Sequence, residues 1–178
     1  MKVSSIRYSV FRTPRVFIFT CFLFLFSINS CKYSFTGIGI PDNVRTFYVS
    51  PFEISAANAD PNLSQTFSDA LRDKIQTESR LTQSETDPHC EFKGSITRYK
   101  ISSIAPQPGE LTAFNRLDVT VNVEFINNKD ETQNWVQPFS YFSDFESDQN
   151  FLTVQDGLVE TINNQLVEDI FNKAFTNW

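Results

Sequence analysis

The side chains best suited to chemistry in this chain are one Cys–His pair and two pairs of carboxylates. His89 and Cys90 are neighbours, so on an extended segment their side chains point apart, and no nearby acid would orient the histidine. One histidine and one free cysteine cannot complete the common zinc sites. The carboxylate pairs could serve two-acid hydrolysis of a glycan, but such neighbours are usually solvated; they are Asp144/Glu146 and Glu168/Asp169. The sequence therefore predicts no enzyme, no metal and no cofactor.

The first thirty residues have the pattern of a secretory signal peptide. Four basic residues precede an apolar run from Val16 to Ile28, and residues 1–30 contain no acidic residue. The run is shorter than the ~20 residues of a typical membrane-spanning helix, although an uncleaved anchor is the alternative. It ends at Asn29-Ser30-Cys31, which with Ile28 resembles the lipobox of bacterial lipoproteins. Cys21 is the weaker candidate, because apolar residues continue after it. We therefore predict a lipoprotein signal peptide at 1–30 and lipidation of Cys31.

This assignment settles the predicted state of the cysteines. If Cys21 leaves with the signal peptide and Cys31 is acylated, Cys90 is the only free thiol and no intramolecular disulfide can form. A Cys31–Cys90 disulfide in an unlipidated secreted protein is the alternative. Lys32 follows the cysteine where an inner-membrane retention signal would need Asp, and no acidic cluster follows. We expect a lipid-anchored protein on the periplasmic face of the outer membrane.

The charge balance limits the partners of the mature chain. The whole chain has 15 basic and 21 acidic residues and a net charge of -6. All the acids lie after residue 30, so the remainder is more acidic still, which argues against nucleic-acid binding by bulk electrostatics. Any anion site must be a local patch. The basic residues on strands that a hairpin would make neighbours are Lys93, Arg98, Lys100 and Arg116, and a solvated sheet face is the alternative interpretation.

The spacing of apolar residues predicts the element order β-α-β-β-β-α. Strands are predicted at 43–52, 91–104, 116–125 and 135–145, and amphipathic helices at 62–80 and 154–176, the second capped by Thr153. A one-residue phase slip near Arg98 indicates a bulge, and Pro138 indicates an edge strand or a bulge. The segment 106–110 is a loop by composition.

These elements predict an α+β fold, a two-layer sandwich in which both helices pack on one face of a four-stranded sheet. The other face of the sheet should be polar. Residues 31–178 form a single domain in this interpretation, with 31–42 as an N-terminal tether. Aromatic residues occupy both faces of the last strand, so some of them should contact something other than the core; they are Phe139, Tyr141, Phe142 and Phe145.

Several motifs resemble the LptE family of lipopolysaccharide-assembly lipoproteins, in its branch with a Tyr-Ser-Phe-Thr-Gly motif. The resemblance spans essentially the whole mature chain. Its motifs are Cys31-Lys32-Tyr33-Ser34-Phe35-Thr36-Gly37, Ile40-Pro41, Pro61-Asn62-Leu63-Ser64-Gln65, Phe92-x-Gly94-x-Ile96, Asn115-Arg116-Leu117, and Asp169-Ile170-Phe171-Asn172-x-Ala174-x-x-Asn177-Trp178.

The resemblance implies a non-catalytic outer-membrane lipoprotein. Such a protein plugs and helps to assemble a large β-barrel lipopolysaccharide translocon of the LptD type, and assists delivery of lipopolysaccharide to the outer leaflet. If lipopolysaccharide is contacted directly, the candidates are Lys93, Arg98, Lys100 and Arg116. The alternatives are a periplasmic lipoprotein that serves another envelope lipid-transport system, and a lipid-anchored enzyme acting on envelope glycans, which the missing catalytic residues disfavour.

Overall fold

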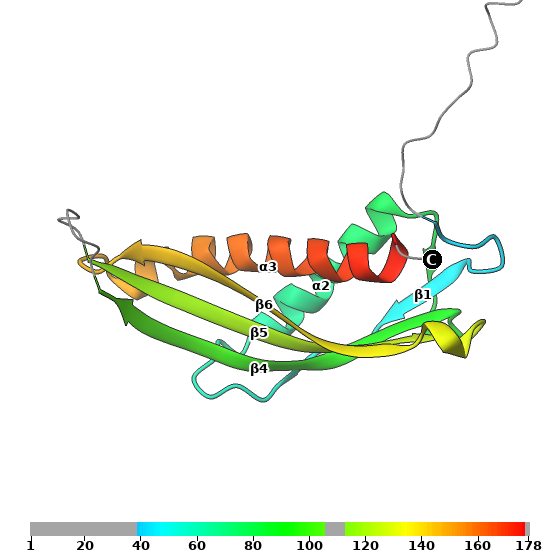
Figure 1. Cartoon of the computed structure of the whole chain (residues 1–178), viewed down its shortest axis with the longest axis horizontal. Coiled ribbons are helices and arrows are strands. Elements are labelled where there is room, and N and C mark those ends of the chain that lie inside the picture. The colour runs from blue at the N-terminus through cyan, green and yellow to red at the C-terminus, as the bar shows by residue number, and fades with distance from the viewer. Residues whose placement is uncertain (1–38, 106–112, 177–178) are drawn as a thin grey trace, which may run out of the picture. The chain divides into compact units, whose positions relative to one another are not determined.

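The computed structural model describes residues 39–105 and 113–176. The predicted signal peptide, Cys31 and the loop at 106–110 lie outside these residues. The main sheet consists of three long antiparallel strands, β4 (Cys90–Ile104), β5 (Phe114–Asn127) and β6 (Trp135–Glu146), with β1 (Thr46–Val49) parallel to β4 (Figure 1). A short 3-10 helix, Glu131–Gln133, lies in the connection from β5 to β6.

The sheet has six strands, whereas four were predicted from the sequence. The extra strands are β2 (Glu53–Ile54) and β3 (Thr82–Gln83), which pair with β4 and β1 respectively. Each has two residues, too few for an alternating pattern to be recognised. The predicted first strand at 43–52 is correspondingly shorter, because the chain leaves β1 at Ser50 and Pro51 before it rejoins the sheet as β2. The strand order is β3-β1-β4-β5-β6, with β2 also paired to β4.

The two helices lie on the same face of the sheet, as predicted (Figure 1). Helix α2 (Leu63–Glu78) buries Leu63, Phe67, Leu71 and Ile75, which recur every four residues. Helix α3 (Phe151–Phe175) begins three residues earlier than predicted. Its N-cap is Asn150 rather than Thr153, because the Asn150 side chain accepts a hydrogen bond from the Leu152 amide at 3.0 Å.

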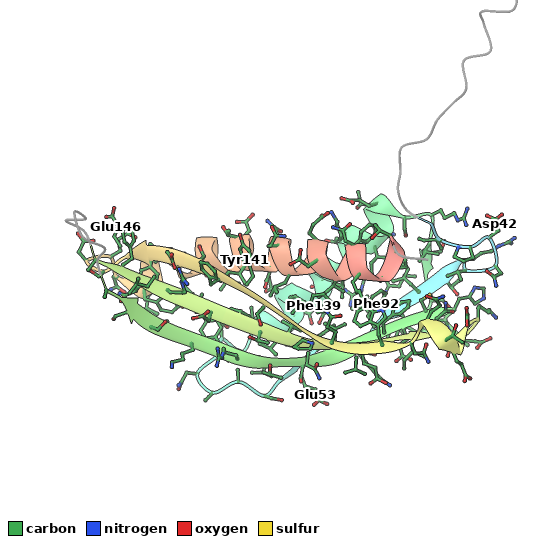
Figure 2. All side chains as sticks on the ribbon, in the orientation of Figure 1. Asp42, Glu53, Phe92, Phe139, Tyr141 and Glu146 are labelled. Atoms are coloured by element: carbon green, nitrogen blue, oxygen red, sulfur yellow. The ribbon has the colours of Figure 1, made fainter. Side chains whose placement is uncertain are left out.

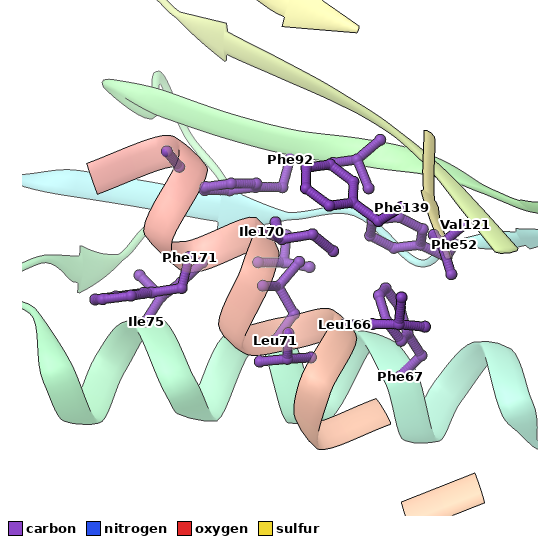
Figure 3. Packing of buried hydrophobic residues seen from close by; sticks show 14 of the residues in the cluster. Phe52, Phe67, Leu71, Ile75, Phe92, Val121, Phe139, Leu166, Ile170 and Phe171 are labelled. Atoms are coloured by element: carbon purple, nitrogen blue, oxygen red, sulfur yellow. The ribbon is translucent and has the colours of Figure 1, made fainter. Parts of the chain in front are cut away.

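The core fills the space between the helices and the sheet. Phe52 and Phe67 pack edge to face, with ring centroids 4.9 Å apart. Figure 3 shows apolar side chains of α2, α3 and the sheet converging in this layer. Phe139 and Phe145 are buried in it, so two of the four aromatic residues noted on the last strand face the core. The continuous core explains why the described residues form one compact unit.

Candidate functional site

The sheet has a polar outer face on the side away from the helices. On β5 the outward residues alternate with the fully buried ones; they are Arg116, Asp118, Thr120, Asn122 and Glu124. Figure 2 shows this separation, with Phe92 and Phe139 toward the helices and Glu53 on the opposite side of the sheet. A one-sided antiparallel sheet has this alternation when the second face is solvated or meets a polar partner. We call this surface, formed by the outward residues of β4, β5 and β6, the outer face.

The structure brings all four predicted basic residues onto the outer face. The register of β4 against β5 shifts between Ile96 and Arg98, which confirms the predicted bulge. Lys93 lies outward before the bulge, and Arg98 and Lys100 lie outward after it, while Tyr99 between them is buried. Arg116 lies outward on the neighbouring strand. The bulge thus gathers side chains that a regular strand would divide between two faces.

Arg116 is held by neighbours on β6. Its guanidinium binds Asp144 through both carboxylate oxygens, at 2.7 Å from Nε and 2.9 Å from Nη2. Its Cζ also lies 3.6 Å from the centroid of the Phe142 ring, which is a cation–π contact. The hydrogen bonds that Arg116 donates to Asp144 raise the pKa of Arg116 above its ordinary value. The positive charge is therefore already paired, so Arg116 is poorly placed to bind a second anion.

The other three basic residues differ in how far they are neutralised. Lys93 Nζ lies 3.7 Å from Glu124, at a distance typical of a loose surface pair. Arg98 lies opposite Thr120 and Lys100 lies opposite Asp118 in the strand register. Both are exposed, and within residues 39–105 and 113–176 neither takes part in an ion pair. Arg98 and Lys100 are consequently the pair most available to an anionic ligand.

Apolar side chains stand on the same outer face along β6. Phe142 is 43% exposed and Val136 is 64% exposed, and their even-numbered phase places both away from the helices. β6 is also an edge strand of the sheet, as Pro138 indicated. Phe142 fulfils the expectation that some aromatics of this strand lie outside the core. Val136 was not singled out from the sequence as an exposed apolar residue. Its separation from Phe142 by an even number of residues would have placed it on the same face of the strand.

The structure does not assemble the residues that could have formed a catalytic site. Nδ1 of His89 accepts a hydrogen bond from the Arg45 amide at 3.0 Å, and the His89 amide donates to Thr46, so the histidine fastens β1 to the start of β4. Burial raises the pKa of the Cys90 thiol to about 12. On β5, Cys90 pairs with Asn127, and Asp144 pairs with Arg116. Asn127 and Arg116 are about 37 Å apart along the strand at ~3.4 Å per residue, so the thiol and this carboxylate lie at opposite ends of the sheet.

No group of three or more His, Cys, Asp or Glu side chains in the described part of the chain could hold a metal ion. No helix among the described residues is long and apolar enough to cross a membrane. The site that remains is a surface, with charged, polar and apolar side chains on one face of a sheet.

This geometry defines the class of fold. It is a two-layer α+β sandwich whose sheet has one face covered by helices and one polar face. The LptE family, described as lipopolysaccharide-assembly, matches residues 44–174. The chain belongs to this family. The match confirms the family resemblance drawn from the sequence motifs. No curated protein sequence is significantly similar to the chain.

Several solved structures are similar to this chain at very low sequence identity. Protein XCC0632 from Xanthomonas campestris superposes with a TM-score of 0.51 at 6% identity, over 75% of this chain and 85% of that one. A minor lipoprotein from Acinetobacter baumannii gives a TM-score of 0.48 at 8% identity, over 74% and 92%. The hypothetical protein CT253 from Chlamydia trachomatis gives 0.48 at 9%, over 75% and 99%. The first of these similarities supports the fold alone.

Proposed function

We propose that this chain is a non-catalytic outer-membrane lipoprotein that plugs and helps to assemble the β-barrel lipopolysaccharide translocon, and so assists delivery of lipopolysaccharide to the outer leaflet. Membership of the lipopolysaccharide-assembly family supports a role in lipopolysaccharide assembly. The observation that carries the plugging role is the polar outer face, which runs along β4, β5 and β6. The lumen of a large outer-membrane barrel is itself polar, so a polar sheet face suits it.

The proposed anchor is a lipid on Cys31, left at the N-terminus after removal of residues 1–30. Residues 31–42 would form the tether that joins the lipid to the domain. At its far end the tether meets the body, because the Gly39 amide donates to the Phe175 carbonyl at 3.0 Å and Ile40 is buried. Arg80 also donates to the Ile40 carbonyl and pairs with Asp42 at 2.9 Å. These contacts support the attachment of the proposed tether to the domain at residues 39–42.

The test of this function is co-purification from envelope membranes in mild detergent. A tagged full chain is expected to bring down a large outer-membrane β-barrel of the LptD type in stoichiometric amount, and mass spectrometry of its N-terminal peptide should show an acylated Cys31. The Cys31→Ala variant should lose the lipid and reach the barrel less efficiently. Recovery of the wild-type chain alone with an unmodified Cys31 would refute both the anchor and the plug. A different transport complex on the beads would favour the accessory-module alternative.

Direct contact with lipopolysaccharide is proposed to involve the outer face, where Lys93, Arg98, Lys100 and Arg116 lie. Arg116 and Lys93 already face carboxylates. We therefore propose that Arg98 and Lys100 contribute more of the binding free energy for lipopolysaccharide. In a titration of the full chain in detergent with labelled lipopolysaccharide, Arg98→Gln/Lys100→Gln should weaken binding by about fivefold per charge, as each basic residue near an anionic surface contributes ~1 kcal/mol.

A matched control removes the same two charges elsewhere. Lys129 lies in the turn after β5, and Lys173 lies in the last turn of α3, and both are exposed. Lys129→Gln/Lys173→Gln should bind lipopolysaccharide nearly as well as the wild type. Equal losses in the two double variants would mean that only net charge matters and that the outer face is not the contact surface.

A further inference from the structure

Strand β6 is an edge of the sheet, and half of its backbone groups face away from β5 (Figure 1). The Ser147 amide donates to the Ala113 carbonyl at 2.9 Å, one step beyond the β5–β6 pair of Phe114 with Glu146. Hydrogen-bonded pairs alternate with non-bonded pairs along an antiparallel ladder. Counting back from Ser147, the odd-numbered residues of β6 therefore bond to β5. The even-numbered residues direct their N–H and C=O groups away from the sheet.

The position of the proline agrees with this assignment. Pro138 is even-numbered, so the N–H group that it lacks would have faced away from β5. Beyond it, Ser140, Phe142 and Asp144 direct their N–H and C=O groups away from β5, and all three residues are exposed. Among the described residues, no other strand pairs with this side of β6. We call the backbone of residues 139–146 on this side the free edge.

The free edge lacks the devices that usually protect such strands. Lysines, prolines and bulges on an exposed edge keep other chains from pairing with it. Residues 139–146 contain no lysine, arginine or proline, and they pair with β5 in one continuous register. Asp144 is neutralised by Arg116. Pro138 blocks pairing only before the free edge, so it sets one limit of the segment that an added strand could cover.

A cleft of about 440 Å³ adjoins the end of the free edge, between β6 and α3. Its walls include Phe145, Val154 and Leu158, and at Gly157 nothing lies within 4 Å of a Cβ built on the backbone. Side chains of a strand added to β6 would alternate between the outer face and the helix side. The helix-side residue opposite Phe145 would lie at the cleft, where the apolar walls favour an apolar side chain.

We propose that the free edge binds an extended segment of a partner protein as an added antiparallel strand. Another extended polypeptide is the partner whose hydrogen-bonding groups match this alternating row of N–H and C=O groups. Glu146 is exposed and takes part in no ion pair among the described residues, so a basic residue of the segment should lie opposite it. The proposal does not depend on lipopolysaccharide binding by the outer face.

A second copy of this chain matches the free edge less well than such a segment. If two copies of β6 paired antiparallel about Phe142, Pro138 of each copy would lie opposite Glu146 of the other. The missing N–H of the proline would remove one hydrogen bond at each end of the pairing. No basic residue would face Glu146, whereas a partner segment can supply one.

The test titrates the full chain in detergent micelles into the peptide Lys-Leu-Thr-Val-Tyr-Thr-Thr, which carries fluorescein on an N-terminal glycine linker and a C-terminal amide. An antiparallel register sets its lysine opposite Glu146 and its leucine opposite Phe145. Fluorescence anisotropy should rise to saturation with a Kd on the order of 100 µM, the affinity we expect of one short added strand. Absence of saturable binding would overturn the proposal.

Two N-methylated peptides test the backbone hydrogen bonds directly. The third and fifth peptide residues lie opposite Asp144 and Phe142 and direct their N–H groups at β6, so methylation of both should weaken binding at least about tenfold. The second and fourth residues direct their N–H groups away from β6, so methylation of both should change the Kd by less than about threefold. Equal losses for the two peptides would overturn the proposal.

Phe142→Pro and Phe142→Ala form a matched pair of protein variants. Both remove the ring, but only proline removes the N–H group that faces the free edge, and neither loses a hydrogen bond to β5. Phe142→Pro should bind the peptide at least about tenfold more weakly than Phe142→Ala, with both folded by circular dichroism. Equal binding would overturn the proposal. If Phe142→Pro does not fold, the methylated peptides still decide the question with the wild-type chain.

The charge and the cleft each have a control. Glu146→Gln should weaken peptide binding about threefold, and Glu131→Gln, an exposed residue before the other end of β6, should not change it. Gly157→Leu fills the cleft and should weaken binding about fivefold, but not for a peptide with alanine in place of leucine. Equal effects of the two glutamate variants, or of Gly157→Leu on the two peptides, would contradict the proposed register.

Sedimentation of the full chain in detergent tests the alternative occupant. We expect no dimer that depends on the free edge. A concentration-dependent dimer that Phe142→Pro abolishes and Phe142→Ala retains would assign the edge to a second copy and overturn the proposal. None of these outcomes alters the co-purification result expected for the proposed function, so the two proposals can fail separately.

Discussion

Gly94 on β4 lies against the backbone carbonyl of Asn122 on β5, so that a Cβ at Gly94 would overlap the carbonyl oxygen. The same Cβ would come within 2.9 Å of Cε1 of Phe52, whose ring covers the glycine from the helix side. Phe52 in turn packs on Phe67 of α2. The missing side chain therefore lets an aromatic ring of the core approach the sheet.

Gly94→Ala is expected to destabilise the protein by about 1–3 kcal/mol, the usual cost of overpacking, because backbone cannot move aside as a flexible side chain could. Gly157 on α3 is the matched control, since nothing lies within 4 Å of a Cβ built there. Gly157→Ala should be neutral or stabilise the helix by up to about 1 kcal/mol. Chemical denaturation of both variants measures the contrast. Similar midpoints would contradict the packing described.

Val121→Asp should unfold the domain. Val121 is fully buried and pairs with Phe139 on β6, so an aspartate there would place an unpaired charge in the core. The cost of several kcal/mol is comparable with the whole stability of a typical domain, ~5–15 kcal/mol. Thr120→Asp on the adjacent, outward position should shift stability by no more than about 1 kcal/mol. An unchanged melting curve for Val121→Asp would mean that the two faces are reversed.

The ion pair between the helices predicts a dependence on acid pH. The hydrogen bond from Lys74 lowers the pKa of Glu168, so its stabilising contribution is present above the unfolded value of ~4.3 and is lost as the pH falls through the folded pKa. Burial would lower the pKa of Lys74, but its hydrogen bonds to Glu168 and Glu78 outweigh burial and raise it. Lys74 therefore stays charged throughout this window.

Glu168→Gln should consequently lose less stability than the wild type between about pH 5 and pH 3. At pH 7 the variant should be less stable by under about 1 kcal/mol, because the Glu168 side chain is 42% exposed and the pair is partly screened. Melting temperatures at a series of pH values give the comparison. Glu131→Gln, at an exposed position outside the ion pairs of the described residues, should parallel the wild type. Parallel curves for Glu168→Gln would refute the prediction.

Thiol counting tests the proposed processing of the chain. Cys90 is fully buried, and its pKa of about 12 leaves almost no thiolate at pH 8. If Cys31 is acylated and Cys21 removed, the folded protein should react with no maleimide and the denatured protein with one equivalent. Cys90→Ala should give no reaction in either state. A reactive thiol in the folded protein would indicate an unmodified Cys31, and no thiol in the denatured wild type would indicate a Cys31–Cys90 disulfide.

The sequence was sufficient for the parts of the fold that depend on periodicity. Alternation along β5 placed Leu117 inward and Arg116 outward, and the phase slip near Arg98 located the bulge. The helical spacing of α2 located its buried stripe. These features are local, because each depends on residues that are close in the sequence. They were enough to predict the polar face of the sheet and the four basic residues on it.

The remaining features depend on partners distant in the sequence. Arg116 contacts Asp144 and Phe142 because of the register between β5 and β6. The alternation of apolar and polar residues along each strand does not determine that register. The strands β2 and β3 exist only through pairing with β4 and β1. Tertiary context, rather than pattern, decides such positions.

The bulge in β4 also bears on how related chains should be aligned. Thr97 is the residue skipped in the pairing, since Ile96 faces Val121 and Arg98 faces Thr120. In a regular strand without a bulge, one inserted residue would move every later side chain to the opposite face of the sheet. Here the inserted position is absorbed locally, and Tyr99 returns to the core. Homologous chains can therefore differ by one residue at this point without inverting a face, and an alignment gap belongs at Thr97 rather than in a loop.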